Sequence, residues 1–233
     1  MTATIDPAFR GDYYTIPMYA MGAGERPEAG GSATLLQVGL QKFLVTAAHV
    51  IRREFIWFPI DGGFRRLNSP GVITNSPGES LRDDHGDLAI FQLTAEDLSF
   101  LHPLFRFIQM NDVDVDLAYR HRDKYEFTGF PWRKDKLDTK LRLMMPSYTS
   151  ITSESVSEKV FAQLGLSVHT HAVISFVRKK MMTNGVRTTA PLPDGMSGGA
   201  VWKRYPGSEV RRLAAITIEH RDNHGERVEL AVL

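Results

Sequence analysis

The chain has 233 residues, with 28 lysines and arginines against 27 acidic residues, eight histidines and no cysteine. The lack of cysteine excludes disulfide scaffolds, thiolate metal sites and cysteine nucleophiles, and the net charge of +1 gives no bulk attraction for nucleic acid or for an acidic membrane. No stretch approaches the about 18 apolar residues of a membrane-spanning helix, and residues 1–20 lack the apolar core of a signal peptide. We therefore expect a globular, cytoplasmic protein.

Short runs of β-branched and aromatic residues, separated by 19 glycines and 12 prolines, predict an all-β fold. Strands are predicted over residues 32–38, 42–47, 55–60, 88–93, 125–130, 140–145, 167–177, 199–202, 212–218 and 227–233. Tight hairpins are predicted at residues 38–41 and 222–225. Helical spacing of apolar residues before Gly165 predicts one helix over residues 153–164, and a short turn is predicted over residues 94–101.

Residues 102–123 form the weakest part of this pattern. An acidic run over residues 111–116 is followed by a basic run over residues 120–122, which is typical of a solvated surface loop. We interpret the segment as the connection between two strand-rich halves.

The first segment with chemical potential is an apolar strand that stops at the small residues Ala47 and Ala48 and is followed by His49. Small residues let the chain turn closely and present an imidazole at the edge of a sheet. Histidine is the natural general base near neutral pH. Taken alone, a histidine in this place is more often a packed or surface residue.

The second segment ends in Asp87, the last polar residue before an apolar strand. A half-buried carboxylate there could accept the imidazole N–H and fix the tautomer of a catalytic histidine. The surrounding Asp83, Asp84 and Gly86 are equally typical of an ordinary turn.

The third segment places Ser197 among Gly195, Gly198 and Gly199, directly before another apolar strand. A nucleophilic hydroxyl needs nearby backbone N–H groups that face the developing oxyanion, and glycines permit the required dihedral angles. The pattern is more specific than a glycine-rich turn.

The three segments occur in the order His, Asp, Ser, at sequence separations of 38 and 110 positions. This is the chain order of chymotrypsin-type enzymes. The blocks Thr46-Ala47-Ala48-His49, Asp87-Leu88-Ala89-Ile90 and Gly195-Met196-Ser197-Gly198-Gly199 resemble the signatures of trypsin-like serine peptidases. Residues 30–34 resemble the early glycine-rich strand of that superfamily, and residues 129–131 resemble a segment common in its bacterial members.

The resemblance implies a single trypsin-like domain over residues 1–233, built from two antiparallel six-stranded β-barrels at residues 15–105 and 124–233 with the active site between them. His49 would be the general base, Asp87 its orienting partner and Ser197 the nucleophile of an endopeptidase that needs no cofactor. The N–H groups of Gly195 and Ser197 would form the oxyanion hole, and the partner would be a protein or peptide substrate.

Met196 departs from the pattern of the digestive relatives, which carry aspartate before the nucleophile to pair with a new N-terminus. Methionine cannot form that ion pair, so the catalytic loop is ordered in another way, by packing or by an activating protein partner. By analogy, Pro191 would lie near the base of the primary substrate pocket, and Ile218 and Glu219 near its wall.

Three other interpretations remain open. The chain could be a catalytically silent binding module on the protease fold. His169 and His171, with His220 or His224, could hold a metal, because alternate residues of a strand point the same way. Short basic clusters at residues 178–180 and 211–212 could contact nucleic acid, although solvated strand ends explain them better. For an active peptidase, a housekeeping role and an effector role in a bacterial stress or defence system are both compatible with the residues.

Overall fold

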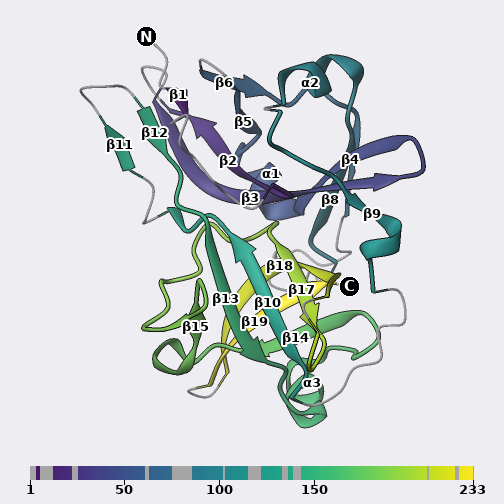
Figure 1. Ribbon diagram of the computed structural model, residues 1–233, viewed down its shortest axis with the longest axis vertical. Helices are drawn as coiled ribbons and strands as arrows, with labels where there is room; N and C mark the ends of the chain where they lie inside the picture. The colour runs from purple at the N-terminus through teal and green to yellow at the C-terminus, as the bar shows by residue number, and fades with distance from the viewer. Residues whose placement is uncertain are drawn as a thin grey trace.

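A computed structural model of the chain describes residues 4–5, 13–22, 26–60, 63–74, 86–101, 103–114, 122–132, 136–138, 143–208, 210–223 and 226–232. Two large sheets, one from each half of the chain, dominate it (Figure 1). This arrangement confirms the predicted all-β class with two antiparallel strand assemblies.

The N-terminal sheet has the strand order β6-β5-β2-β3-β4-β8-β7, and a short β9 pairs in parallel with β3. Its strands are β2 (Thr15–Met21), β3 (Pro27–Val38), β4 (Gln41–Ala47), β5 (Trp57–Ile60), β6 (Gly63–Arg66), β7 (Gly71–Ile73), β8 (Leu88–Gln92) and β9 (Ile108–Gln109). The predicted hairpin at residues 38–41 is confirmed, since β3 and β4 pair from Val38 and Gln41 outward. Helix α1 (Ala48–Arg52) follows β4, helix α2 (Ala95–Phe100) follows β8, and the 3-10 turn η2 (Met110–Asp112) follows β9.

The C-terminal sheet has the strand order β14-β19-β18-β17-β10-β13-β15-β16. Its strands are β10 (Lys124–Gly129), β13 (Thr149–Glu154), β14 (His171–Ser175), β15 (Met182–Thr183), β16 (Val186–Arg187), β17 (Ala200–Arg204), β18 (Arg211–Asn223) and β19 (Glu226–Val232). Six consecutive strands of this sheet run from β14 to β13. An isolated bridge between Ser155, just after β13, and Ile174 of β14 connects the two ends of this series. Helix α3 (Glu158–Leu164) lies between β13 and β14, and the 3-10 turn η4 (Arg178–Lys180) follows β14.

A third, small sheet joins the beginning of the chain to its middle. In it, β1 (Thr4–Ile5) pairs in parallel with β12 (Leu143–Met145), which pairs with β11 (Lys136–Asp138).

The two halves share an apolar core as well as having cores of their own. One cluster of buried side chains contains Val45 from β4 and Ile108 from β9, together with Trp202 from β17 and Leu213 and Ile216 from β18. Burial of apolar surface on both sides of this boundary stabilises one relative placement of the sheets. Strands β4 and β18 are thereby in contact across this boundary.

The predicted helix over residues 153–164 is wrong in its first part. Residues 149–154 form strand β13, which pairs along its whole length with β10, and the helix begins only at Glu158 after Ser157. The β-branched residues of this stretch suit a strand, and pairing with β10 outweighs the helical spacing. The predicted end is confirmed, because Gly165 caps the helix in the left-handed conformation with φ +70°.

The interpretation of residues 111–116 as a solvated loop is wrong for Asp114. This residue is buried, its N–H donates to the carbonyl oxygen of Leu213 at 2.8 Å, and its carboxylate lies 3.6 Å from the ammonium of Lys203. Lys203 also lies 3.2 Å from Asp123. The acidic residue is therefore buried with a cationic partner and ties the connecting segment to the C-terminal sheet.

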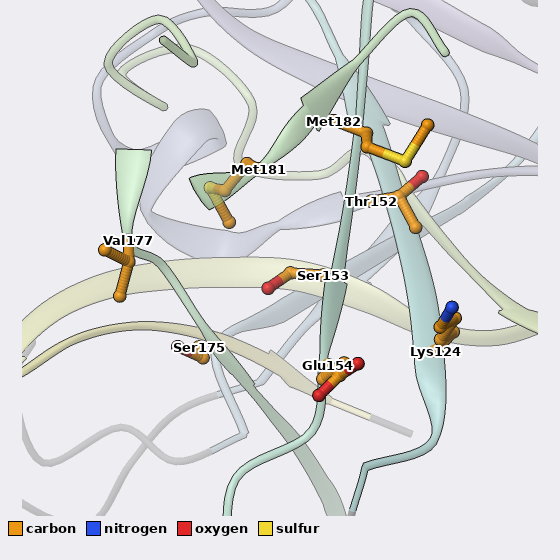
Figure 2. Close-up of a pocket in the computed structure, with 8 residues that line it drawn as sticks. All are labelled: Lys124, Thr152, Ser153, Glu154, Ser175, Val177, Met181 and Met182. Atoms are coloured by element: carbon orange, nitrogen blue, oxygen red, sulfur yellow. The ribbon is translucent and has the colours of Figure 1, made fainter. Parts of the chain in front are cut away.

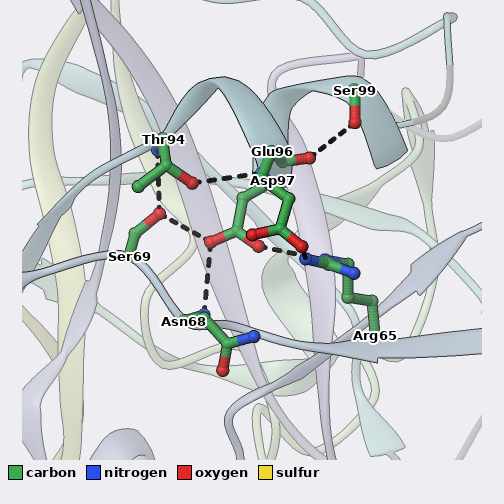
Figure 3. A network of polar contacts seen from close by, with 7 residues as sticks. All are labelled: Arg65, Asn68, Ser69, Thr94, Glu96, Asp97 and Ser99. Atoms are coloured by element: carbon green, nitrogen blue, oxygen red, sulfur yellow. Dashed lines mark hydrogen bonds and ion pairs between the residues drawn. The ribbon is translucent and has the colours of Figure 1, made fainter.

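A polar network around Asp97 ties helix α2 to β6 and to the segment that follows β6 (Figure 3). The carboxylate of Asp97 is fully buried and accepts from Arg65 Nε at 3.1 Å, from Ser69 Oγ at 2.6 Å and from the N–H of Asn68 at 3.2 Å. Thr94 caps the helix by accepting the Asp97 N–H at 3.2 Å, which confirms the predicted turn. Contacts with Glu96 and then with Asp97 raise the pKa of the Arg65 guanidinium.

No helix in the described part of the chain is long and apolar enough to cross a membrane.

Candidate active site

His49 and Asp87 are brought together by the pairing of β4 with β8. Ala47 at the end of β4 is opposite Leu88 at the start of β8, so the residues just beyond the paired positions become neighbours. The fully buried Ala47 and Ala48 leave room for the chain to turn from strand into helix α1, and His49 is the second residue of that helix.

Asp87 holds the histidine segment through three hydrogen bonds. Its backbone carbonyl accepts the N–H of Ala48 at 2.8 Å, Oδ1 accepts the N–H of His49 at 2.9 Å, and Oδ2 lies 2.6 Å from His49 Nδ1. The Asp87 side chain is only 8% exposed and that of His49 is 19% exposed. Because an ionised carboxylate only accepts, Nδ1 carries the proton, and Nε2 is left as the acceptor that a general base needs.

The loop around Ser197 is seated between the two sheets. The carbonyl of Ser197 accepts the N–H of Ser32 from β3 at 2.8 Å, and that of Gly198 accepts the Thr34 hydroxyl at 3.0 Å. On the other side, Thr217 of β18 accepts the Gly198 N–H at 2.7 Å and donates to the Gly199 carbonyl at 2.9 Å. The nucleophile candidate is therefore fixed to both halves of the chain.

Gly198 brings this loop to the strand that leads to His49. Its φ is +89°, and an added Cβ would overlap the carbonyl oxygen of Ser32 and the hydroxyl of Thr46, which lies three residues before His49. The close approach and the positive φ both require glycine. Among the described residues the Ser197 hydroxyl makes no hydrogen bond, to His49 or to any other group.

The backbone amides of the loop fall into two groups. Those of Met196, Gly198 and Gly199 donate to the carbonyls of Pro193, Thr217 and Met196 respectively, at 2.7 to 2.9 Å. Those of Gly195 and Ser197 donate to no group in the part of the chain that the structure describes. These are the two amides that the sequence predicts as oxyanion donors.

The direction of the Gly195 and Ser197 amides, which no described residue engages, is set by the carbonyl at the other end of each peptide plane. The carbonyl of Asp194 accepts the Trp132 N–H at 3.0 Å, and that of Met196 accepts the Gly199 N–H at 2.9 Å. In a planar trans peptide the N–H points opposite to the C=O. The N–H groups of Gly195 and Ser197 are therefore held pointing away from these partners, and Gly195 adopts a φ of +96°.

The predicted substrate residues lie near this loop without forming a described pocket. Pro191 is half-buried on the segment that leads into the loop. Ile218 is 2% exposed and belongs to a core cluster that also contains Val50 and Phe161. The backbone of Glu219 lies in β18, and its side chain is outside the described part. Their role in substrate binding stays a prediction.

A separate pocket of about 490 Å³ lies between β10, β13 and residues 175–182. Figure 2 shows the charged side chains of Lys124 and Glu154 at one end of the pocket and the apolar side chains of Met181 and Met182 at the other. None of the residues that line it belongs to the triad or to the loop around Ser197.

The alternative metal site has no support in the described residues. No group of three histidine or acidic side chains there is placed to hold a metal ion. His171 is buried, and its Nδ1 lies 2.8 Å from the hydroxyl of Thr170. His224 and the side chain of His220 lie outside the described part.

Two residues of the site are missed by sequence reasoning. Ser32 contacts the loop through its backbone and its side chain, and Trp132 holds the peptide before Gly195 through its N–H. A serine directly after two glycines in an apolar strand is the one local signal for Ser32. Trp132 has none, because the contact is made by its backbone.

Comparison with known proteins supports the fold and does not assign a family. No protein-family model matches the chain, and no curated protein sequence matches it. Among solved structures, the chain is similar to the structure of GrC, with a TM-score of 0.52 and 12% sequence identity over 99% of this chain and 92% of that one. The similarity over nearly the full length, with the two antiparallel sheets, shows a chymotrypsin-type fold.

Proposed function

We propose that the protein is a serine endopeptidase that hydrolyses peptide bonds through an acyl-enzyme intermediate. The observation that carries the proposal is the pair of amides at Gly195 and Ser197, which donate to no described residue, whereas those of Met196, Gly198 and Gly199 donate to carbonyls. Preorganised donors of this kind stabilise the charge that develops on a carbonyl oxygen. Two amides beside a serine that no described residue engages are what an oxyanion site requires.

In the proposed acylation, His49 Nε2 takes the proton of the Ser197 hydroxyl while Oγ attacks the substrate carbonyl. The negative charge on the carbonyl oxygen is accepted by the N–H groups of Gly195 and Ser197. Asp87 stabilises the imidazolium through the 2.6 Å contact with Nδ1. The C–N bond then breaks as His49 returns the proton to the leaving amine.

Deacylation repeats these steps with water in place of the serine hydroxyl. His49 takes a proton from water, the hydroxyl adds to the ester carbonyl, and the C–O bond to Ser197 breaks as Oγ regains a proton. The same two amides stabilise the second tetrahedral intermediate. The chemistry needs no metal or organic cofactor.

Burial of Met196 supports activity without N-terminal activation. Its side chain is fully buried in a cluster that includes Phe127, Met181 and Ala190. Apolar packing here takes the place of the buried ion pair that an aspartate would form. This packing supports a loop that is ordered without a pairing N-terminus.

The proposal is tested with a fluorophosphonate probe and a peptide library. The wild-type protein is expected to be labelled on Ser197 and to cleave peptides internally, as mass spectrometry of the products would show. Ser197→Ala, which keeps the loop backbone, is expected to lose both. A folded wild-type protein that neither labels nor cleaves would instead support the silent binding module.

A further inference from the structure

Ser32 uses every polar group it has on the loop around Ser197 and on its immediate supports. Its N–H donates to the carbonyl of Ser197 at 2.8 Å, and its carbonyl accepts the Thr46 hydroxyl at 2.6 Å. Its own hydroxyl donates to the carbonyl of Gly195 at 2.8 Å and accepts the N–H of Phe130 at 3.0 Å. Ser32 is a polar residue between Gly31 and Ala33 of β3, and it is fully buried.

We propose that the Ser32 hydroxyl is a positioning group for the oxyanion hole, so that the N-terminal sheet holds the hole in its working arrangement. The inference rests on the proposed function. It adds a residue that touches no substrate and acts through Gly195.

The direction of the hydroxyl proton follows from the two contacts. A hydroxyl has one proton to donate, and the N–H of Phe130 can only donate, so it occupies a lone pair of Oγ. The proton is then directed to the carbonyl of Gly195. The peptide between Gly195 and Met196 is thus held at both ends, since the Met196 N–H donates to Pro193 at 2.8 Å.

Gly195 is the joint at which this restraint matters. Glycine rotates freely about φ and ψ, so a loose peptide after Gly195 would let the peptide before it turn and swing its N–H away. The hydroxyl also couples the two sides of the joint. It accepts the N–H of Phe130, which lies two residues before Trp132. The N–H of Trp132 in turn donates to the carbonyl of Asp194, in the peptide that precedes Gly195. One side chain therefore restrains the loop and the segment that supports it.

The Ser32 hydroxyl lies in a tightly packed place between three segments. An added Cβ on Gly129 would lie 3.0 Å from Ser32 Oγ and 3.0 Å from the Cα of Met196, so the three segments are in close contact. Loss of the hydroxyl leaves two buried backbone groups, the Gly195 carbonyl and the Phe130 N–H, without their partner. The Gly195 carbonyl and the Phe130 N–H can then regain hydrogen-bond partners if the loop rotates.

Ser32→Ala is the test, with Thr128→Val as the matched control. Thr128 is also fully buried, and its hydroxyl donates to the carbonyl of Ala200 at 3.0 Å, so its removal deletes a comparable hydrogen bond away from Gly195. The measurements are the labelling rate with a fluorophosphonate, kcat and KM on a cleaved peptide, and hydrogen exchange of the amides of residues 194–199. The melting temperature of each variant reports general stability.

Ser32→Ala is expected to lower kcat and the labelling rate about 10- to 100-fold, which is no more than the effect of removing one oxyanion donor. KM is expected to stay within about threefold of the wild-type value. Exchange at residues 194–199 is expected to rise by at least about tenfold. Thr128→Val is expected to lower the melting temperature similarly and to keep the labelling rate and the loop exchange of the wild type. If Ser32→Ala does not fold, Ser32→Cys is the second variant. Because its thiol is a weak donor, its kcat and labelling rate are expected to lie between the wild-type values and those predicted for Ser32→Ala.

The inference is overturned if the folded Ser32 variant keeps the wild-type kcat and loop exchange, or if both variants lose kcat equally. A wild-type protein that does not label contradicts the proposed function and leaves the exchange comparison decisive. In that case faster loop exchange in Ser32→Ala alone supports the positioning role, and unchanged exchange overturns it.

Discussion

Replacing Gly198 by alanine tests how the loop around Ser197 is seated on the N-terminal sheet. The new Cβ would overlap the carbonyl oxygen of Ser32 and the hydroxyl of Thr46. These two atoms are themselves hydrogen-bonded at 2.6 Å, so neither can move without loss of a buried hydrogen bond. To reach the contact distance of about 3.5 Å between non-bonded atoms, the loop has to shift by more than about 1 Å.

The free-energy cost has a backbone part and a packing part. A positive φ, here +89°, costs a non-glycine residue about 1 to 2 kcal/mol. Disruption of the buried hydrogen bond adds about 1 to 3 kcal/mol. Gly39→Ala is the control, because Gly39 has φ +59° with no atom within 4 Å of the added Cβ and carries the backbone part alone.

Urea unfolding followed by circular dichroism measures the free energy of unfolding of both variants, and fluorophosphonate labelling measures the site. Gly198→Ala is expected to be less stable than Gly39→Ala by about 1 to 3 kcal/mol. It is also expected to label at least about 100-fold more slowly, because a displacement of about 1 Å misplaces the nucleophile. Equal stabilities of the two variants, together with a wild-type labelling rate for Gly198→Ala, would refute this seating of the loop.

Three further substitutions test other parts of the structure. Asp87→Asn is expected to keep the fold and to lower kcat about 10⁴-fold, because the amide favours the wrong tautomer of His49. Steady-state kinetics on a cleaved peptide measure kcat, and a decrease of less than tenfold would contradict this prediction. Met196→Asp buries a carboxylate in an apolar cluster and is expected to lower the free energy of unfolding by more than about 3 kcal/mol, whereas Met196→Leu costs less than about 1.5 kcal/mol; equal denaturation midpoints would argue against apolar ordering of the loop. Asp97→Ala removes the buried acceptor of Arg65, Asn68 and Ser69, while Arg65 keeps its contact with Glu96. It is expected to cost about 1 to 3 kcal/mol in urea unfolding with little change in labelling, and a cost below about 0.5 kcal/mol would mean that the network contributes little.

The strands that the sequence predicts well are those whose local composition agrees with their tertiary pairing. The run at residues 42–47 becomes β4 over Gln41–Ala47, and the run at residues 88–93 becomes β8 over Leu88–Gln92. The strand β2 is not predicted, because Pro17 and two methionines interrupt any strand pattern in Thr15–Met21. Pairing with β3 over nearly its whole length makes this segment a strand.

The residue types of the candidate site and their order along the chain follow from the sequence alone. His49, Asp87, Ser197 and Gly195 are recognisable because each carries a chemical property, a titratable ring, a carboxylate, a hydroxyl or a permissive backbone, that is present before the chain folds. The same holds for the all-β class, which follows from local composition.

Which groups meet in space depends on the tertiary structure. Ser32 and Gly195 are 163 residues apart, and their hydrogen bond exists only because the two sheets bury a common apolar boundary. The contacts of Asp87 with the backbone N–H and with Nδ1 of His49, and the burial of Asp114, likewise depend on contacts between distant segments. Hydrogen bonds act over a few ångströms, so no pattern along the chain specifies them until packing has fixed where the strands end.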